Sequence, residues 1–93
     1  MESQDVQVHF EEEGSRLLAV EIGRSGRSPV ILALHSALLA LGIVISTYQV
    51  RTASTGLVER VVIERQDGGS IDGRLGVATR AAILPIALRG SEG

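Results

Sequence analysis

The feature that most constrains the fold is a stretch from Ser28 to Val50 that contains no Asp, Glu, Lys or Arg. Its first part, residues 29–41, reads PVILALHSALLAL and is rich in helix formers behind an opening proline. Gly42 interrupts the run, and residues 43–50, IVISTYQV, have the β-branched and aromatic composition of a strand. A helix, a glycine that ends it and a strand in such close order predict an α-to-β unit whose helix is apolar on nearly every side.

The same stretch is long enough to span a bilayer, so a small single-pass membrane protein is the rival interpretation. Against it, the strongly apolar residues end near Ile45, polar residues follow at 46–49, and His35 and Ser36 interrupt the run. The acidic segment Glu11–Glu13 precedes the stretch, which argues against a signal peptide. We therefore expect a cytoplasmic chain with no membrane partner.

Length and composition narrow the class of protein. At 93 residues we expect one domain over residues 1–93 with a core from about 15 to 88, and oligomerisation would supplement so small a core. A net charge of −2, one Phe, one Tyr and no Trp argue against nucleic-acid binding. The chain has no cysteine, and His9 and His35 lack metal-ligand spacing, so we predict no metal and no cofactor. No nucleophile is paired with a base, so we do not expect an enzyme.

Hydrophobic periodicity predicts the remaining elements. The pattern predicts strands at residues 6–10, 15–22, 43–51, 57–65 and 86–88, and a second helix from about 70 to 84 that Pro85 ends. Glu11–Gly14 is expected to form the charged turn of an N-terminal hairpin, with His9 facing solvent. This order predicts an α+β, ferredoxin-like βαββαβ sandwich, in which two helices cover one face of an antiparallel sheet, with an extra N-terminal strand.

The segment GRSPVILALHSALLALGIVISTYQVRT resembles the first helix and second strand of the ACT domain. ACT domains are small regulatory modules that often bind amino acids beside metabolic enzymes. In the similar modules at the end of bacterial uridylyltransferases, this helix follows Asp-Arg-Pro-Gly and ends in Leu-Gly. Here residues 26–29 are Gly-Arg-Ser-Pro, and Leu41 and Gly42 follow at the same separation. The resemblance covers residues 15–88 or so, and implies an ACT-like fold.

The resemblance also implies a function. It suggests a free-standing, dimeric regulatory domain that senses a small metabolite, an amino acid or a related anion, or regulates a metabolic enzyme. In ligand-binding ACT domains the effector lies by the loop before the first helix and the start of the second strand, commonly at a dimer interface. The corresponding residues form the predicted ligand site: Gly26, Arg27, Ser28, Pro29, Val30, Val44 and Ile45.

Three of these positions depart from the family's pattern. Gly26 replaces an acid, Pro29 brings a ring and no N–H where the family has glycine, and Val44 replaces a frequent asparagine. Arg27 keeps its match and, with Arg24, forms a basic loop that suits an anion before a helix N-terminus. The departures favour an alternative function, a ligand-free dimerisation or assembly module. In either case we expect a homodimer or a higher oligomer.

Overall fold

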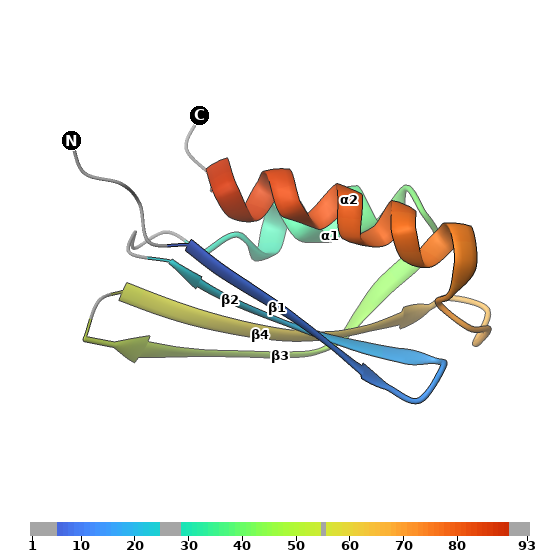
Figure 1. Cartoon of the computed structure of the whole chain (residues 1–93), viewed down its shortest axis with the longest axis horizontal. Helices are drawn as coiled ribbons and strands as arrows, with labels where there is room; N and C mark the ends of the chain where they lie inside the picture. The colour runs from blue at the N-terminus through green and yellow to red at the C-terminus, as the bar shows by residue number, and fades with distance from the viewer. Residues whose placement is uncertain (1–5, 25–28, 55, 90–93) are drawn as a thin grey trace.

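The computed structural model describes residues 6–24, 29–54 and 56–89. The described residues form four strands and two helices in the order ββαββα (Figure 1). The elements are β1 Val6–Glu13, β2 Leu17–Arg24, α1 Ile31–Leu39, β3 Ile43–Ala53, β4 Gly56–Arg65 and α2 Gly73–Arg89.

The strands form one antiparallel sheet in the spatial order β1-β2-β4-β3. Both helices lie on the same face of this sheet, which leaves the other face open (Figure 1). The predicted α+β class, with two helices on one face of an antiparallel sheet, is therefore confirmed, and the arrangement is compatible with a ferredoxin-like fold. The detailed order differs, because β1 occupies the edge beside β2 and no strand follows α2 in the described part of the chain.

The predicted strand at residues 86–88 is wrong, because α2 continues through Pro85 to Arg89. A proline inside a helix removes one N–H and leaves the carbonyl four residues earlier without its donor, here that of Ala81. Ala81 is exposed, so water can hydrogen-bond this carbonyl. Ile83 and Ala87, on either side of the proline, are fully buried in the core. The burial of these two side chains favours a continuous helix despite the missing hydrogen bond.

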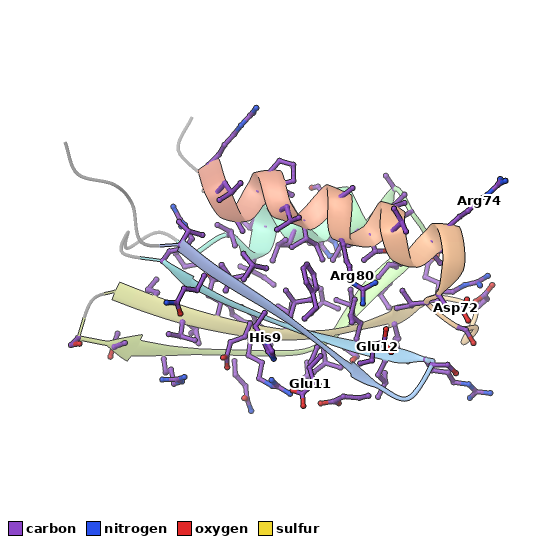
Figure 2. All side chains as sticks on the ribbon, viewed as in Figure 1. His9, Glu11, Glu12, Asp72, Arg74 and Arg80 are labelled. Carbon is purple, nitrogen blue, oxygen red and sulfur yellow. The ribbon has the colours of Figure 1, made fainter. Side chains whose placement is uncertain are left out.

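The predicted N-terminal hairpin is confirmed, but its acidic residues belong to a strand and not to the turn. β1 extends through Glu13 and pairs along its whole length with β2. On the open face Arg60 of β4 reaches Glu13 at 3.0 Å and Glu11 at 3.9 Å. From the other side Arg80 of α2 reaches Glu12 at 3.3 Å (Figure 2). The two arginines thus compensate the three carboxylates from opposite faces of the strand.

The hydrophobic core lies between the helices and the covered face of the sheet. Its most buried apolar side chains include Leu18, Val20, Ile22, Leu34, Leu38, Ile43, Val61, Ile63, Ile83 and Ala87. The first helix is shorter than predicted: it begins at Ile31, with Val30 as its N-cap, and ends at Leu39. Gly42 has a φ of 77°, the left-handed conformation that glycine adopts without strain, and it ends the helical segment as predicted.

Candidate functional site

Glu59 is a buried carboxylate on the covered face of β4, where it alternates with Val61 and Ile63. Only 2 % of its surface is exposed. Its two oxygens accept hydrogen bonds from the backbone N–H of Val30, at 3.1 and 3.0 Å, and Val30 is the N-cap of α1. The N-terminus of a helix has a partial positive charge and unpaired N–H groups, so a negative group is stabilised there. Glu59 therefore caps α1 from a neighbouring strand.

Tyr48 of β3 is a second donor to this carboxylate, and a β-bulge brings it there. Ser46 is an extra residue between Ile45 and Thr47, and its hydroxyl donates to the carbonyl of Val62 at 3.1 Å. The insertion shifts the alternation of β3, so that Ile45 and Tyr48 both face the helices. The Tyr48 hydroxyl then donates to the carboxylate Oε1 at 3.0 Å. Burial, this hydrogen bond and the negative charge of its acceptor raise the pKa of Tyr48 to about 12.

The contact between Tyr48 and Glu59 predicts that the folded protein loses stability at alkaline pH. The folded state holds the tyrosine proton more tightly than the unfolded state, in which the pKa is about 10. The resulting stability is complete below pH about 10 and is lost as the pH rises toward 12. Because Tyr48 is the only tyrosine, tyrosinate absorbance reports this residue alone.

We expect the folded protein to titrate near pH 12 and Glu59→Gln to titrate closer to 10. Circular dichroism of the same samples separates titration in the folded protein from unfolding. A wild-type transition near pH 10 with the fold intact would contradict the contact.

Of the predicted ligand residues that the structure describes, Val44 and Ile45 lie apart from Pro29 and Val30. Residues 26–28 lie outside the described residues. Pro29 is exposed, and Val30 is buried with its N–H bonded to the capping carboxylate. Val44 belongs to the open face of the sheet, away from α1, and Ile45 to the covered face. The residue of β4 that pairs with Ile45 lies four positions from the capping carboxylate. The two positions are therefore about 13 Å apart along the strand.

Glu59 is not among the residues predicted to be functional, although the sequence contains a signal for it. In the strand predicted at residues 57–65, Glu59 lies two positions before Val61 and four before Ile63, so the three side chains point to the same face. One acid among the inward-facing residues of an apolar strand indicates a buried carboxylate that needs a partner. The partner itself, a backbone N–H distant in sequence, is not visible in any local pattern.

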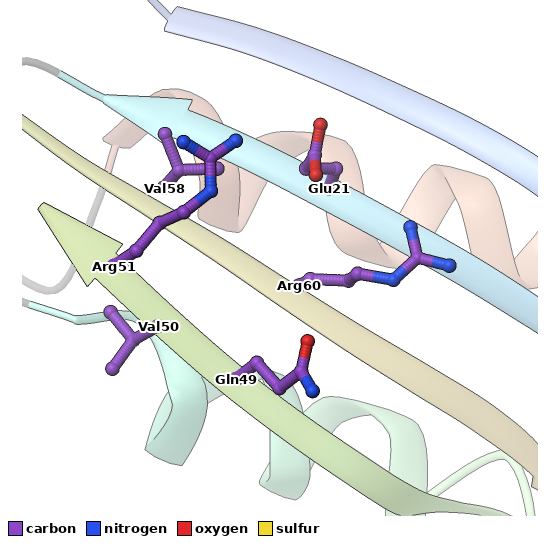
Figure 3. A pocket seen from close by; sticks show the side chains of 6 residues that line it. All are labelled: Glu21, Gln49, Val50, Arg51, Val58 and Arg60. Carbon is purple, nitrogen blue, oxygen red and sulfur yellow. The ribbon is translucent and has the colours of Figure 1, made fainter. Parts of the chain in front are cut away.

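The open face of the sheet contains a shallow depression of about 350 Å³ (Figure 3). Its lining residues are Glu21, Gln49, Val50, Arg51, Val58 and Arg60. Arg60 lies directly opposite Glu21 on the neighbouring strand, and its guanidinium is already paired with Glu13. Arg51 is exposed and has no ion pair within the described residues. A carboxylate beside a guanidinium can bind a zwitterion such as an amino acid.

The outer surface of the two helices exposes several large apolar side chains. Five exposed large hydrophobic side chains belong to them: Leu32, Leu39, Val77, Leu84 and Leu88. Leu32 is 80 % exposed and Val77 69 %. α1 has no charged residue, and α2 has three arginines and no acid. His35 is exposed on α1. Several exposed apolar side chains on two adjacent helices are typical of a surface that contacts another protein.

Comparison of the chain with protein-family models, with curated proteins and with solved structures gave no match. The resemblance to ACT domains therefore stays a prediction. Among the described residues, no group of three or more His, Asp or Glu side chains is arranged to hold a metal ion. Neither α1 nor α2 is both long enough and apolar enough to cross a membrane.

Proposed function

We propose that this chain is a ligand-independent assembly module that binds another protein surface through its helices. The observation that supports the proposal is the outer surface of α1 and α2, where large apolar side chains are exposed and no acidic residue occurs. A domain of this size buries a limited share of its own surface, so covering these side chains in a complex would add stability that the small core does not supply.

The start of α1 is poorly suited to bind an effector carboxylate, although the ACT resemblance implies a ligand there. Pro29 has no N–H to donate, and the N–H of Val30 already donates to Glu59. A carboxylate that approached this turn would meet the negative charge of Glu59 in a buried environment, where repulsion between like charges is strong. The helix start therefore supports the ligand-free form of the hypothesis.

Amino-acid sensing on the open face is a second candidate function, favoured by the depression over β2, β4 and β3. Glu21 would bind the ammonium group of the amino acid, and the exposed guanidinium of Arg51 would bind its carboxylate. This position differs from the helix start that the ACT resemblance implies, so the two sites can be distinguished by mutation.

A thermal-shift screen against the amino acids and small anionic metabolites tests the proposal. A ligand at a hundred times its dissociation constant adds about 2.7 kcal/mol to the free energy of unfolding. For a domain of this size that raises the Tm by on the order of ten degrees or more. We expect no ligand to produce such a shift.

A selective shift in Tm would contradict ligand independence. The variant Arg51→Gln would then show where the ligand binds. Loss of the shift in this variant would indicate the open face. A shift that persists would indicate a ligand elsewhere, with the segment before α1 as the next region to mutate.

A further inference from the structure

The sequence contains two Asp-Gly pairs, and both lie between β4 and the second residue of α2: Asp67-Gly68 and Asp72-Gly73. An aspartate before glycine cyclises onto the backbone more readily than other aspartates, because glycine has no side chain to shield the attacking nitrogen. The third aspartate, Asp5, precedes a β-branched valine, and the sequence has no asparagine. The two Asp-Gly pairs are therefore the positions of the sequence at which this rearrangement is expected to be fastest.

The rearrangement needs two groups to meet. The backbone nitrogen of the glycine attacks the side-chain carboxyl carbon of the aspartic acid, and the N–H proton leaves with the carboxyl OH as water. Water then opens the resulting succinimide ring at either carbonyl. Opening at the α-carbonyl gives isoaspartate, in which the main chain runs through the former side-chain carboxyl carbon. One water is lost and one regained, so the reaction needs no oxidant, reductant or other co-reactant.

At Asp67 both reacting groups are held. Oδ1 of Asp67 accepts the N–H of Gly69 at 2.9 Å, and Oδ2 lies 2.6 Å from Nη2 of Arg65. The attacking nitrogen, that of Gly68, donates its hydrogen to the carbonyl of Arg65 at 3.1 Å. Ring closure at Asp67 therefore requires hydrogen bonds to break first.

The same contacts also disfavour the reactive form of Asp67. The hydrogen bond from Gly69 and the guanidinium of Arg65 keep the pKa of Asp67 below its ordinary value. The neutral acid cyclises faster than the carboxylate because it can release water, and a lowered pKa makes the neutral acid rarer at neutral pH. The side chain of Asp67 is 63 % exposed. Its contacts, and not burial, therefore protect it.

At Asp72 both reacting groups are free within the described residues. Asp72 is exposed at the beginning of α2, and its carboxylate makes no hydrogen bond or ion pair there (Figure 2). Gly73 is the first residue of α2, so its N–H has no acceptor inside the helix, and no acceptor before it in the described chain. Apart from adjacent residues and helix backbone, no atom lies within 4 Å of where a Cβ of Gly73 would be.

We propose that Asp72 is a site of spontaneous isoaspartate formation, and that Asp67, although it also precedes glycine, is protected by its contacts with Arg65 and Gly69. This inference goes beyond the proposed assembly function. It assigns a covalent modification site whose reaction takes place within one chain and requires no partner.

The modification would act on the start of α2. The carbonyl of Asp72 accepts the N–H of Gly76 at 3.1 Å, the first hydrogen bond of the helix, and isoaspartate removes this carbonyl from the main chain. The buried Ile71 donates its N–H to the carbonyl of Ser15 at 2.9 Å, so the lengthened backbone has to fit between this anchor and the helix. We expect the modified protein, separated by chromatography, to have a Tm lower by about 4–8 °C, as for the loss of one helical hydrogen bond.

Ageing of the folded protein at neutral pH and physiological temperature tests the proposal. Trypsin releases residues 66–74, QDGGSIDGR, as one peptide that contains both pairs. Electron-transfer fragmentation of this peptide shows which aspartate has isomerised. A synthetic peptide of the same sequence, blocked at both ends and aged in parallel, gives the rates without the fold. We expect similar rates at both positions in the synthetic peptide, and in the protein a rate at Asp72 at least about tenfold higher than at Asp67.

Arg65→Gln is the matched variant, because it removes the guanidinium that holds Asp67 and leaves the Asp72-Gly73 pair unchanged. Its tryptic peptide begins at residue 61, since the cleavage site at 65 is lost. We expect isomerisation at Asp67 to rise about two- to fivefold in this variant. An unchanged rate would contradict the protective role of Arg65.

Two results would overturn the proposal itself. One is an equal rate at the two positions in the folded wild type. The other is the absence of isoaspartate at Asp72 by the time that half of the synthetic peptide has isomerised.

Discussion

Glu59→Ala is expected to lower the free energy of unfolding by about 3 kcal/mol. The substitution leaves the buried N–H of Val30 and the hydroxyl of Tyr48 without their acceptor. A buried polar group that loses its partner costs about 1–3 kcal/mol, and removal of the side chain also opens space beside the start of α1. For a domain of this size the Tm should fall by on the order of 12–24 °C. Chemical denaturation followed by circular dichroism measures the change.

Glu64→Ala is the matched control for this experiment. Glu64 belongs to the same strand but lies on the open face, and it makes no ion pair within the described residues. Its replacement should change the free energy of unfolding by no more than about 0.5 kcal/mol. Glu59→Gln keeps one acceptor oxygen and should be intermediate. Equal stabilities of Glu59→Ala and Glu64→Ala would show that the capping carboxylate does not stabilise the fold.

Pro85→Ala is expected to raise the free energy of unfolding by about 2 kcal/mol. Alanine restores the N–H that the carbonyl of Ala81 lacks, and in a helix interior it is favoured over proline by about 3 kcal/mol. The loss of proline makes the unfolded chain more flexible, which offsets up to about 1 kcal/mol of that gain. Thermal unfolding should show an increase in Tm on the order of 8–16 °C.

The same substitution distinguishes the helix from the strand that the sequence predicts after Pro85. If residues 86–88 formed a strand, alanine at position 85 would complete no helical hydrogen bond, and no comparable gain would follow. Pro29→Ala provides the control, because Pro29 precedes the N-cap of α1 and lies outside any helix. Its effect should stay within about 0.5–1 kcal/mol.

Local composition was sufficient to predict the first helix, the glycine after it and the strand that follows. The change from helix formers to β-branched residues marks the junction, and the positive φ of Gly42 explains why the change occurs there. The same reasoning predicted α2 but placed its end too early, at Pro85. Proline is a strong local signal for a helix end, but the burial of Ile83 and Ala87 is a tertiary effect that outweighs it.

The bulge at Ser46 is the main reason why the polar cluster could not be predicted. Without it, strict alternation would place Tyr48 on the open face, opposite to Ile45. With it, Tyr48 reaches Glu59. A bulge depends on the pairing of two strands, and neither strand's sequence alone reveals it.

The capping carboxylate can be set beside one departure from the predicted ACT resemblance. The ACT pattern has an acid in the loop before the first helix, and this chain has Gly26 at that position. Here an acid is supplied to the start of the helix from β4, by Glu59.

The spatial order of the strands has a consequence for the kinetics of folding. β1 with β2 and β3 with β4 are hairpins between neighbours in the chain, and hairpins form in microseconds. The sheet is complete only when β2 pairs with β4, which closes a loop that contains α1. Glu59 lies in that pairing, opposite Ile22, and bonds the start of α1, so the two hairpins and the helix meet at one place. We therefore expect the folding rate to depend on this central contact, and substitutions at the outer strands to act mainly on the rate of unfolding.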